Sequence, residues 1–100
     1  MSTREVRHVV FHTPGPAWEA GKSMFEQPGL QAHLAHYRQW LEAGKMQAGG
    51  PFLDSAGGGM MLPTADVSEA EVQAFAQADP SVQAGLLVAH VRPWMLGMKA

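Results

Sequence analysis

Five histidines and no cysteine define the chemistry open to this 100-residue chain. Without cysteine, disulfides and thiolate nucleophiles are excluded, and neither a Walker nor a GxGxxG pattern for binding phosphates is present. His33 is the side chain best suited to chemistry, because an imidazole titrates near neutral pH and this one falls inside a helical pattern. It could serve as a general acid or base, or it could be a half-buried histidine that bonds a backbone carbonyl.

The carboxylate of Asp79 also has two interpretations. It could accept a ring N–H from His33 and so orient the imidazole. It could equally cap a short turn that begins at Pro80, and both roles can hold together. His33 and His36 are three residues apart, which could suit a metal, but the sequence offers no clear third ligand. No metal and no cofactor are therefore predicted.

Alternating and helical hydrophobic patterns predict the elements that must position these groups. Four strands are expected at 5–12, 45–53, 60–64 and 86–94, and two helices at 28–43 and 69–79. Pro51 marks the second strand as an edge strand, because proline cannot donate to a ladder. Ser68 and Glu71 form a capping box before the second helix. Residues 81–85 are predicted to form a turn.

The first helix has the clearest pattern. Pro28 suits its first turn, and Gly44 suits the position after its end. Four apolar residues spaced by three and four predict its buried stripe, namely Leu30, Leu34, Tyr37 and Leu41. His33 lies on the border of this stripe.

The element order βαββαβ predicts an α+β fold in a single domain spanning residues 1–100. We expect a ferredoxin-like plait, a four-stranded antiparallel sheet of order 4-1-3-2 with two helices on one face. The other face would be bare, and a second copy of the chain is its simplest cover, so a homodimer is predicted.

This topology brings several distant segments to one end of the sheet. His33 and Asp79 should lie close together there, beside the long 13–27 connection and the glycine-rich 57–59 hairpin. The pair is predicted to be catalytic. Six residues are predicted to bind a substrate: His12, Trp18, Phe25, His36, Gly50 and Pro51. Trp18 and Phe25 are expected to anchor the 13–27 connection.

The segments HLAHYRQWLEAGKMQAGGPFLD, ADPSVQAGLL and VRPW resemble the YciI-like, or YCII-related, family. The resemblance runs from about Val9 to Trp94 and implies the plait and the homodimer of the dimeric α/β-barrel superfamily. It also implies that His33 and Asp79 are the family's catalytic pair. Some members act in the elimination or isomerisation of aromatic-derived rings. His36 stands where the family often has an aromatic residue, so the resemblance assigns it no role.

Charge and hydropathy exclude other classes of function. The net charge of -2 and the absence of a basic cluster argue against nucleic-acid binding. No apolar run is long enough to span a membrane, and the charged start MSTREVRHVV does not resemble a signal peptide, so a cytoplasmic protein is predicted. The hypothesis is a cofactor-independent enzyme for a small molecule. The alternative is a non-catalytic dimer that binds a small ligand or a partner.

Overall fold

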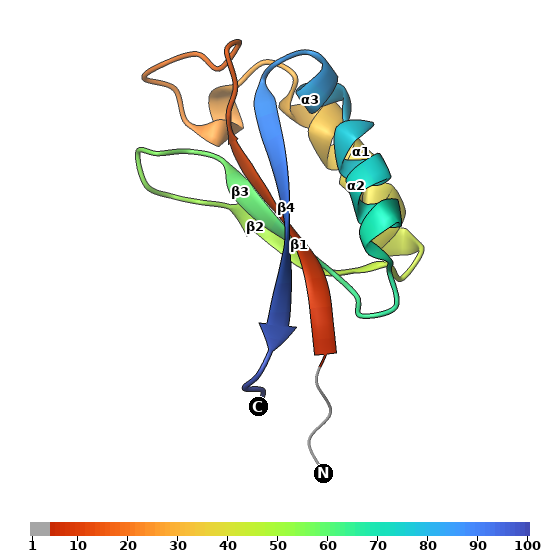
Figure 1. The fold of residues 1–100 in the computed structure, drawn as a ribbon. Coiled ribbons are helices and arrows are strands. Elements are labelled where there is room, and N and C mark those ends of the chain that lie inside the picture. The colour runs from red at the N-terminus through yellow and green to blue at the C-terminus, as the bar shows by residue number, and fades with distance from the viewer. Residues whose placement is uncertain (1–4) are drawn as a thin grey trace.

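A computed structural model describes residues 5–100 of the chain (Figure 1). Four strands and two longer helices follow one another in the predicted order, with two short helices added. The strands are β1 (Glu5–Pro14), β2 (Met46–Pro51), β3 (Gly59–Pro63) and β4 (Leu87–Leu96). The helices are η1 (Met24–Glu26), α1 (Leu30–Glu42), α2 (Glu69–Gln77) and α3 (Pro80–Gln83).

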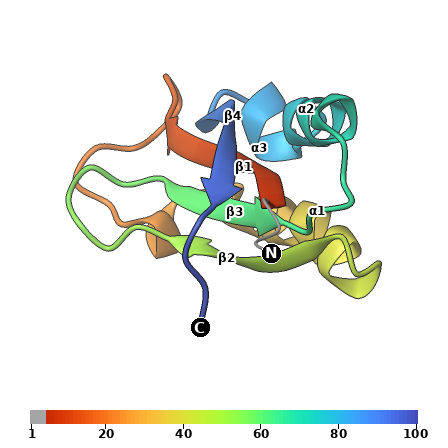
Figure 2. The same ribbon diagram turned by 60° about the horizontal axis from the view of Figure 1, so that its bottom comes forward.

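The strands form one antiparallel sheet of order β2-β3-β1-β4, as the sequence predicts. β1 and β4 pair along their whole lengths, from Glu5 opposite Leu96 to Pro14 opposite Leu87. β2 is an edge strand, so the missing N–H of Pro51 removes no hydrogen bond from the interior of the sheet. All the helices lie on one face of the sheet (Figures 1 and 2). The α+β ferredoxin-like fold is therefore confirmed.

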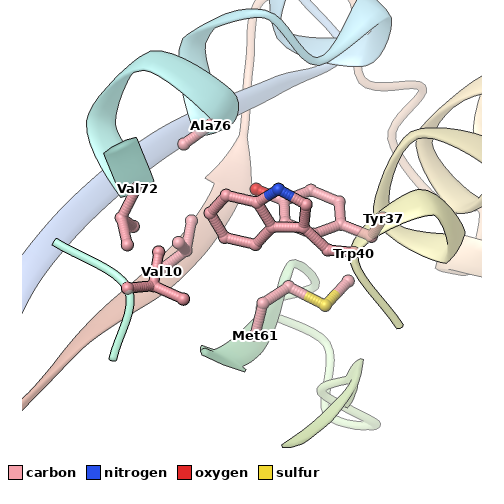
Figure 3. Close-up of a cluster of buried hydrophobic side chains, with 7 residues drawn as sticks. Val10, Tyr37, Trp40, Met61, Val72 and Ala76 are labelled. Carbon is pink, nitrogen blue, oxygen red and sulfur yellow. The ribbon is translucent and has the colours of Figure 1, made fainter. Parts of the chain in front are cut away.

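Two apolar clusters hold the helices against the sheet. The larger one joins α1 and α2 to the central strands (Figure 3) and consists of Val10, Tyr37, Trp40, Met61, Val67, Val72 and Ala76. In it, the ring of Trp40 stacks on Phe75 with centroids 3.9 Å apart. The smaller cluster contains Met24, Leu30, Leu86 and Leu87 and fixes the start of α1 beside the start of β4.

Helix α1 differs from its prediction at its start and in its buried face. It begins at Leu30, because Gly29 at the N-cap has a φ of 93°, so Pro28 lies outside the helix. Leu34 and Leu41 are 37% and 54% exposed, whereas His33 and Trp40 are buried. The buried face is thus rotated by roughly 50° from the predicted stripe, at about 100° per residue. Instead of packing in the core, the two leucines line a cavity.

The connection between β1 and α1 is packed, but not by both predicted anchors. Trp18 is half-buried against the smaller cluster and lies beside Gly57 of the β2–β3 hairpin. The prediction for Phe25 is wrong in this structure, since its side chain is 68% exposed and the neighbouring Met24 is buried instead. The short helix η1 turns the chain so that only one of these two adjacent side chains can face inward.

The remaining local predictions concern α2 and α3. The Ser68 hydroxyl accepts a hydrogen bond from the Glu71 backbone N–H at 3.2 Å, which confirms Ser68 as the cap of α2. The other half of the predicted capping box is not formed, because the Glu71 carboxylate pairs with Lys45. The turn predicted at 81–85 is instead the helix α3, with Pro80 in its first turn. In the described part of the chain, no helix is long and apolar enough to cross a membrane.

Candidate active site

His33 and Asp79 form a buried hydrogen bond, although 46 positions separate them in the sequence. The Nδ1 atom of His33 lies 2.6 Å from the Oδ2 atom of Asp79. His33 comes from the first turn of α1, and Asp79 is the N-cap of α3. The contact between α1 and α3 therefore sets this distance. The predicted proximity of the two side chains is confirmed, and the bond is direct rather than through water.

The second carboxylate oxygen of Asp79 is used locally. Its Oδ1 atom accepts from the Ser81 backbone N–H at 2.9 Å and from the Ser81 hydroxyl at 2.8 Å. Burial alone would raise the pKa of Asp79, but the hydrogen bonds from His33 and Ser81 outweigh it, and the pKa is lowered. The carboxylate is therefore ionised at neutral pH and can only accept.

The charge of Asp79 decides the tautomer of His33. Because the carboxylate accepts, the Nδ1 atom of His33 carries the hydrogen. The Nε2 atom of His33 has no hydrogen-bond partner among residues 5–100 and is not among the buried unpartnered atoms. In the neutral ring, Nε2 thus offers a lone pair that can take a proton from a bound molecule.

His12 and Tyr37 lie beside this pair. The ring centroid of His12 is 4.9 Å from that of His33, and its Nε2 atom is 3.4 Å from the Tyr37 hydroxyl. Burial lowers the pKa of His12 from 6.5 to about 4, with a further lowering by the nearby His33, although the negative charge of Asp79 opposes both effects. His12 is therefore neutral near neutral pH.

A cavity of about 260 Å³ opens above these polar side chains. His12, His33 and Tyr37 contribute to its lining, and most of the rest is apolar. Its side walls include Leu34 and Leu41, which explains why these two helical leucines are exposed rather than packed into the core. The size suits a small ligand, since cavities for drug-sized ligands usually start at about 300 Å³.

Residues 6–95 match the YCII-related domain. The chain belongs to this family. Among solved structures it is similar to 5-chloro-2-hydroxyhydroquinone dehydrochlorinase (TftG) from Burkholderia phenoliruptrix AC1100, in complex with 2,5-dihydroxybenzoquinone. That similarity has a TM-score of 0.63 and 28% sequence identity, and it covers 89% of this chain and 92% of the dehydrochlorinase. No curated protein matches the chain.

Most of the predicted binding residues of this YCII-related domain surround one cavity. His12, Phe25, Gly50 and Pro51 line it together with His33. Their roles in binding stay predictions.

Two of the predicted binding residues lie elsewhere. Trp18 lines a separate hollow between the 14–25 segment and the β2–β3 hairpin. His36 points toward α2, where its Nε2 atom is 2.7 Å from the Phe75 carbonyl oxygen and its ring stacks on the Phe75 ring. The structure therefore does not place Trp18 or His36 in the cavity that His33 lines.

Sequence reasoning missed two polar groups of this site. Tyr37 was considered only as an apolar side chain, although its hydroxyl reaches His12. Ser81 had no assigned role, yet it holds Asp79 through two hydrogen bonds. A signal for Ser81 exists in the sequence, because an N-cap aspartate commonly bonds the backbone N–H two or three residues later.

Three donor groups of the YCII-related domain lie close enough to raise the question of a metal. His12, His33 and Asp79 each offer one atom, and these atoms lie within 4.8 Å of one another. His12 is thus the third ligand that the sequence did not reveal. However, two ligands of a tetrahedral zinc, each about 2.0–2.1 Å from the ion, would lie about 3.3 Å apart. The 2.6 Å between His33 and Asp79 fits a shared hydrogen instead.

Proposed function

We propose that this YCII-related domain is a small enzyme that moves a proton without a cofactor, in an elimination or isomerisation of a small oxygen-bearing ring. One observation carries the proposal. His33 lines a mostly apolar cavity, and its buried hydrogen bond to Asp79 leaves His33 Nε2 free. A general base must combine a free lone pair with access to the substrate, and this imidazole has both.

The chemistry follows from the two partners of the imidazole ring. His33 Nε2 takes a proton from the bound ring compound, and the electron pair of the broken bond stays on the substrate. The imidazolium that forms is stabilised by the carboxylate of Asp79, which already accepts its Nδ1–H. In an elimination, the electron pair forms a double bond and the leaving group departs with its own bonding pair.

The structural similarity supports this class of substrate. A dehydrochlorination removes a proton and a chloride, which is an elimination of the kind that the His33–Asp79 pair can assist. The dehydrochlorinase is named for a chlorinated hydroquinone and is seen with a dihydroxybenzoquinone, both of them single oxygen-bearing rings. At about 260 Å³, the cavity of this chain suits a single ring better than a large metabolite.

The test is chloride release from 5-chloro-2-hydroxyhydroquinone, measured for the wild type and for His33→Ala and Asp79→Asn. Loss of general acid–base catalysis should lower the rate by about 10²- to 10⁴-fold in His33→Ala. Gln31→Ala is the control, since Gln31 is exposed on α1 and lies outside the cavity. Turnover that survives in His33→Ala would contradict the proposal. Binding without turnover in the wild type would favour the non-catalytic ligand-binding alternative.

We also propose that the protein is a homodimer that pairs through the free face of its sheet. Side chains alternate along β4, so Ala89 and Val91 pack toward the helices while Val88 and Trp94 point to the other face. Trp94 is 44% exposed there, and no helix covers this face (Figures 1 and 2). An apolar sheet face of this kind is commonly covered by a partner. The cytoplasmic location remains a prediction.

A further inference from the structure

We infer that the Tyr37 hydroxyl is a further catalytic group, which donates a hydrogen bond to an oxygen on the substrate ring while His33 moves the proton. The inference rests on the proposed function and adds a requirement to the substrate. The ring must carry a keto, enol or phenol oxygen that can accept negative charge. His12 would be the positioning residue that directs this hydroxyl.

Tyr37 lies one helical turn after His33 and lines the same cavity. The centroids of the two rings are 5.3 Å apart. Residues four apart are neighbours on one helix face, about 6 Å apart along the axis. A single small ring in the cavity can therefore meet both side chains at once.

The tautomer of His12 decides whether the hydrogen of the Tyr37 hydroxyl is free. Within the described residues, Tyr37 Oη has a single hydrogen-bond partner, His12 Nε2 at 3.4 Å. His12 Nδ1 is buried and has no partner among those residues. Nδ1 is unsatisfied in either tautomer of His12, as a donor or as an acceptor, so the surroundings of Nε2 decide where the ring hydrogen lies.

The nearby charge of Asp79 favours the tautomer of His12 with its hydrogen on Nε2. Its Nε2 atom lies 4.0 Å from Oδ2 of the ionised Asp79, and a negative charge attracts an N–H. With the hydrogen on Nε2, His12 donates toward Tyr37 Oη, which then acts as the acceptor. The phenolic hydrogen is not used in this contact, so it can turn toward a molecule in the cavity.

Both groups keep these protonation states near neutral pH. Burial, followed by the charge of Asp79, raises the pKa of Tyr37, so the phenol retains its hydrogen. Burial lowers the pKa of His12 to about 4, so this ring stays neutral and holds only one hydrogen. A neutral donor in an apolar cavity stabilises a developing oxyanion more strongly than a donor in water would.

The two groups complete one proton-transfer step. A proton leaves a saturated ring carbon beside a carbonyl group, as in a keto tautomer of the ring, for His33 Nε2, and the electron pair of that C–H bond forms the enolate whose oxygen Tyr37 binds. When the pair returns from the oxygen, the leaving group departs with its own bonding electrons, as chloride does from a chlorinated ring. No oxidant, reductant or further reactant is needed.

Tyr37→Phe tests the inference, because it removes only the hydroxyl and keeps the ring that packs in the core. The probe is 2,5-dihydroxybenzoquinone, and chlorobenzene is the control ring without oxygen. We expect the affinity for the quinone to fall roughly 10- to 100-fold, as for a hydrogen bond to a charged acceptor. The affinity for chlorobenzene should not change. The infrared carbonyl stretch of the quinone should shift to lower frequency in the wild-type complex and shift less in Tyr37→Phe.

Each outcome supports or overturns the inference. Equal quinone affinity in the wild type and Tyr37→Phe overturns it, and so does a wild type that does not bind the quinone. If Tyr37→Phe does not fold, the infrared shift in the wild type still decides, since an unshifted stretch means that no donor reaches the carbonyl. His33→Ala separates the two proposals: turnover that survives in it refutes the proposed function, while its quinone affinity still reports on Tyr37.

Discussion

The burial of His12 makes the stability of this protein depend on pH in a defined window. In the unfolded chain the imidazole has its ordinary pKa of 6.5, and in the folded protein burial lowers it to about 4. As the pH falls from 6.5 toward 4, the unfolded state binds a proton that the folded state excludes. The contribution of His12 is therefore fully present above pH 6.5 and is lost on acidification through that window.

The magnitude follows from the difference between the two pKa values. One pKa unit is worth about 1.4 kcal/mol, so lowering the value from 6.5 to about 4 corresponds to about 3 kcal/mol. That is a large share of the 5–15 kcal/mol that stabilises a typical domain. Asp79 loses its contribution to the free energy of unfolding at more acidic pH than His12 does. Its pKa in the folded protein lies below the ordinary value of 3.8, so the contribution disappears only below pH 3.8.

The assay is urea unfolding of the wild type and His12→Asn at one protein concentration, at pH 7, 6, 5 and 4.5. The free energy of unfolding of the wild type should fall more steeply with acidification than that of His12→Asn. The difference between the two slopes should amount to about 2–3 kcal/mol by pH 4.5. Gln31→Ala, at an exposed position on α1, should keep the wild-type slope. Parallel curves for the wild type and His12→Asn would refute the reasoning.

Three further predictions concern the parts of the fold that surround the cavity and the free sheet face. Trp18→Ala should release the 15–27 segment from the β2–β3 hairpin, with a loss of about 2 kcal/mol and faster proteolysis within that segment; an unchanged cleavage rate would contradict the contact with Gly57. Gly58→Ala should cost at least about 3 kcal/mol, since the new Cβ would lie 2.0 Å from the His12 carbonyl oxygen. Gly44→Ala, also at positive φ but in open space, should cost only about 1–2 kcal/mol when both variants are unfolded with urea. Sedimentation should show a wild-type dimer at micromolar concentration and a monomer for Trp94→Asp, and a wild-type monomer would contradict the pairing of the sheet faces.

Topology was the most predictable feature of this chain. The strand order, the single helical face and the proximity of His33 to Asp79 all follow from the βαββαβ pattern, because each connection allows few arrangements. The cap at Ser68 and the edge position of Pro51 could also be predicted from the sequence, since each depends on one residue and its immediate neighbours.

The buried face of α1 was not predictable in the same way. Hydrophobic spacing assumes that apolar side chains face the core, but Leu34 and Leu41 face an open cavity instead. His33 takes a place in the interior because Asp79, from a different part of the chain, satisfies its ring nitrogen. A single-helix pattern contains no information about such a partner.

The same limit applies to Tyr37 and Phe25. Tyr37 fits the apolar spacing, and only the position of His12 on β1 shows that its hydroxyl has a polar environment. Which of two adjacent side chains, Met24 or Phe25, turns inward depends on the path of η1. Both questions are decided by contacts between segments rather than by residue type.

The hydrogen bonds that Asp79 makes to His33 and to the Ser81 amide connect the proposed catalytic pair to the local unfolding of α3. One oxygen holds His33, while the other holds the Ser81 amide, so opening of this four-residue helix would release both at once. Amide hydrogen exchange at Ser81 can therefore report how often the pair is broken, without any substrate. In Asp79→Glu, the longer side chain keeps the charge but cannot keep both contacts, and exchange at Ser81 should become faster even where the imidazole retains its carboxylate.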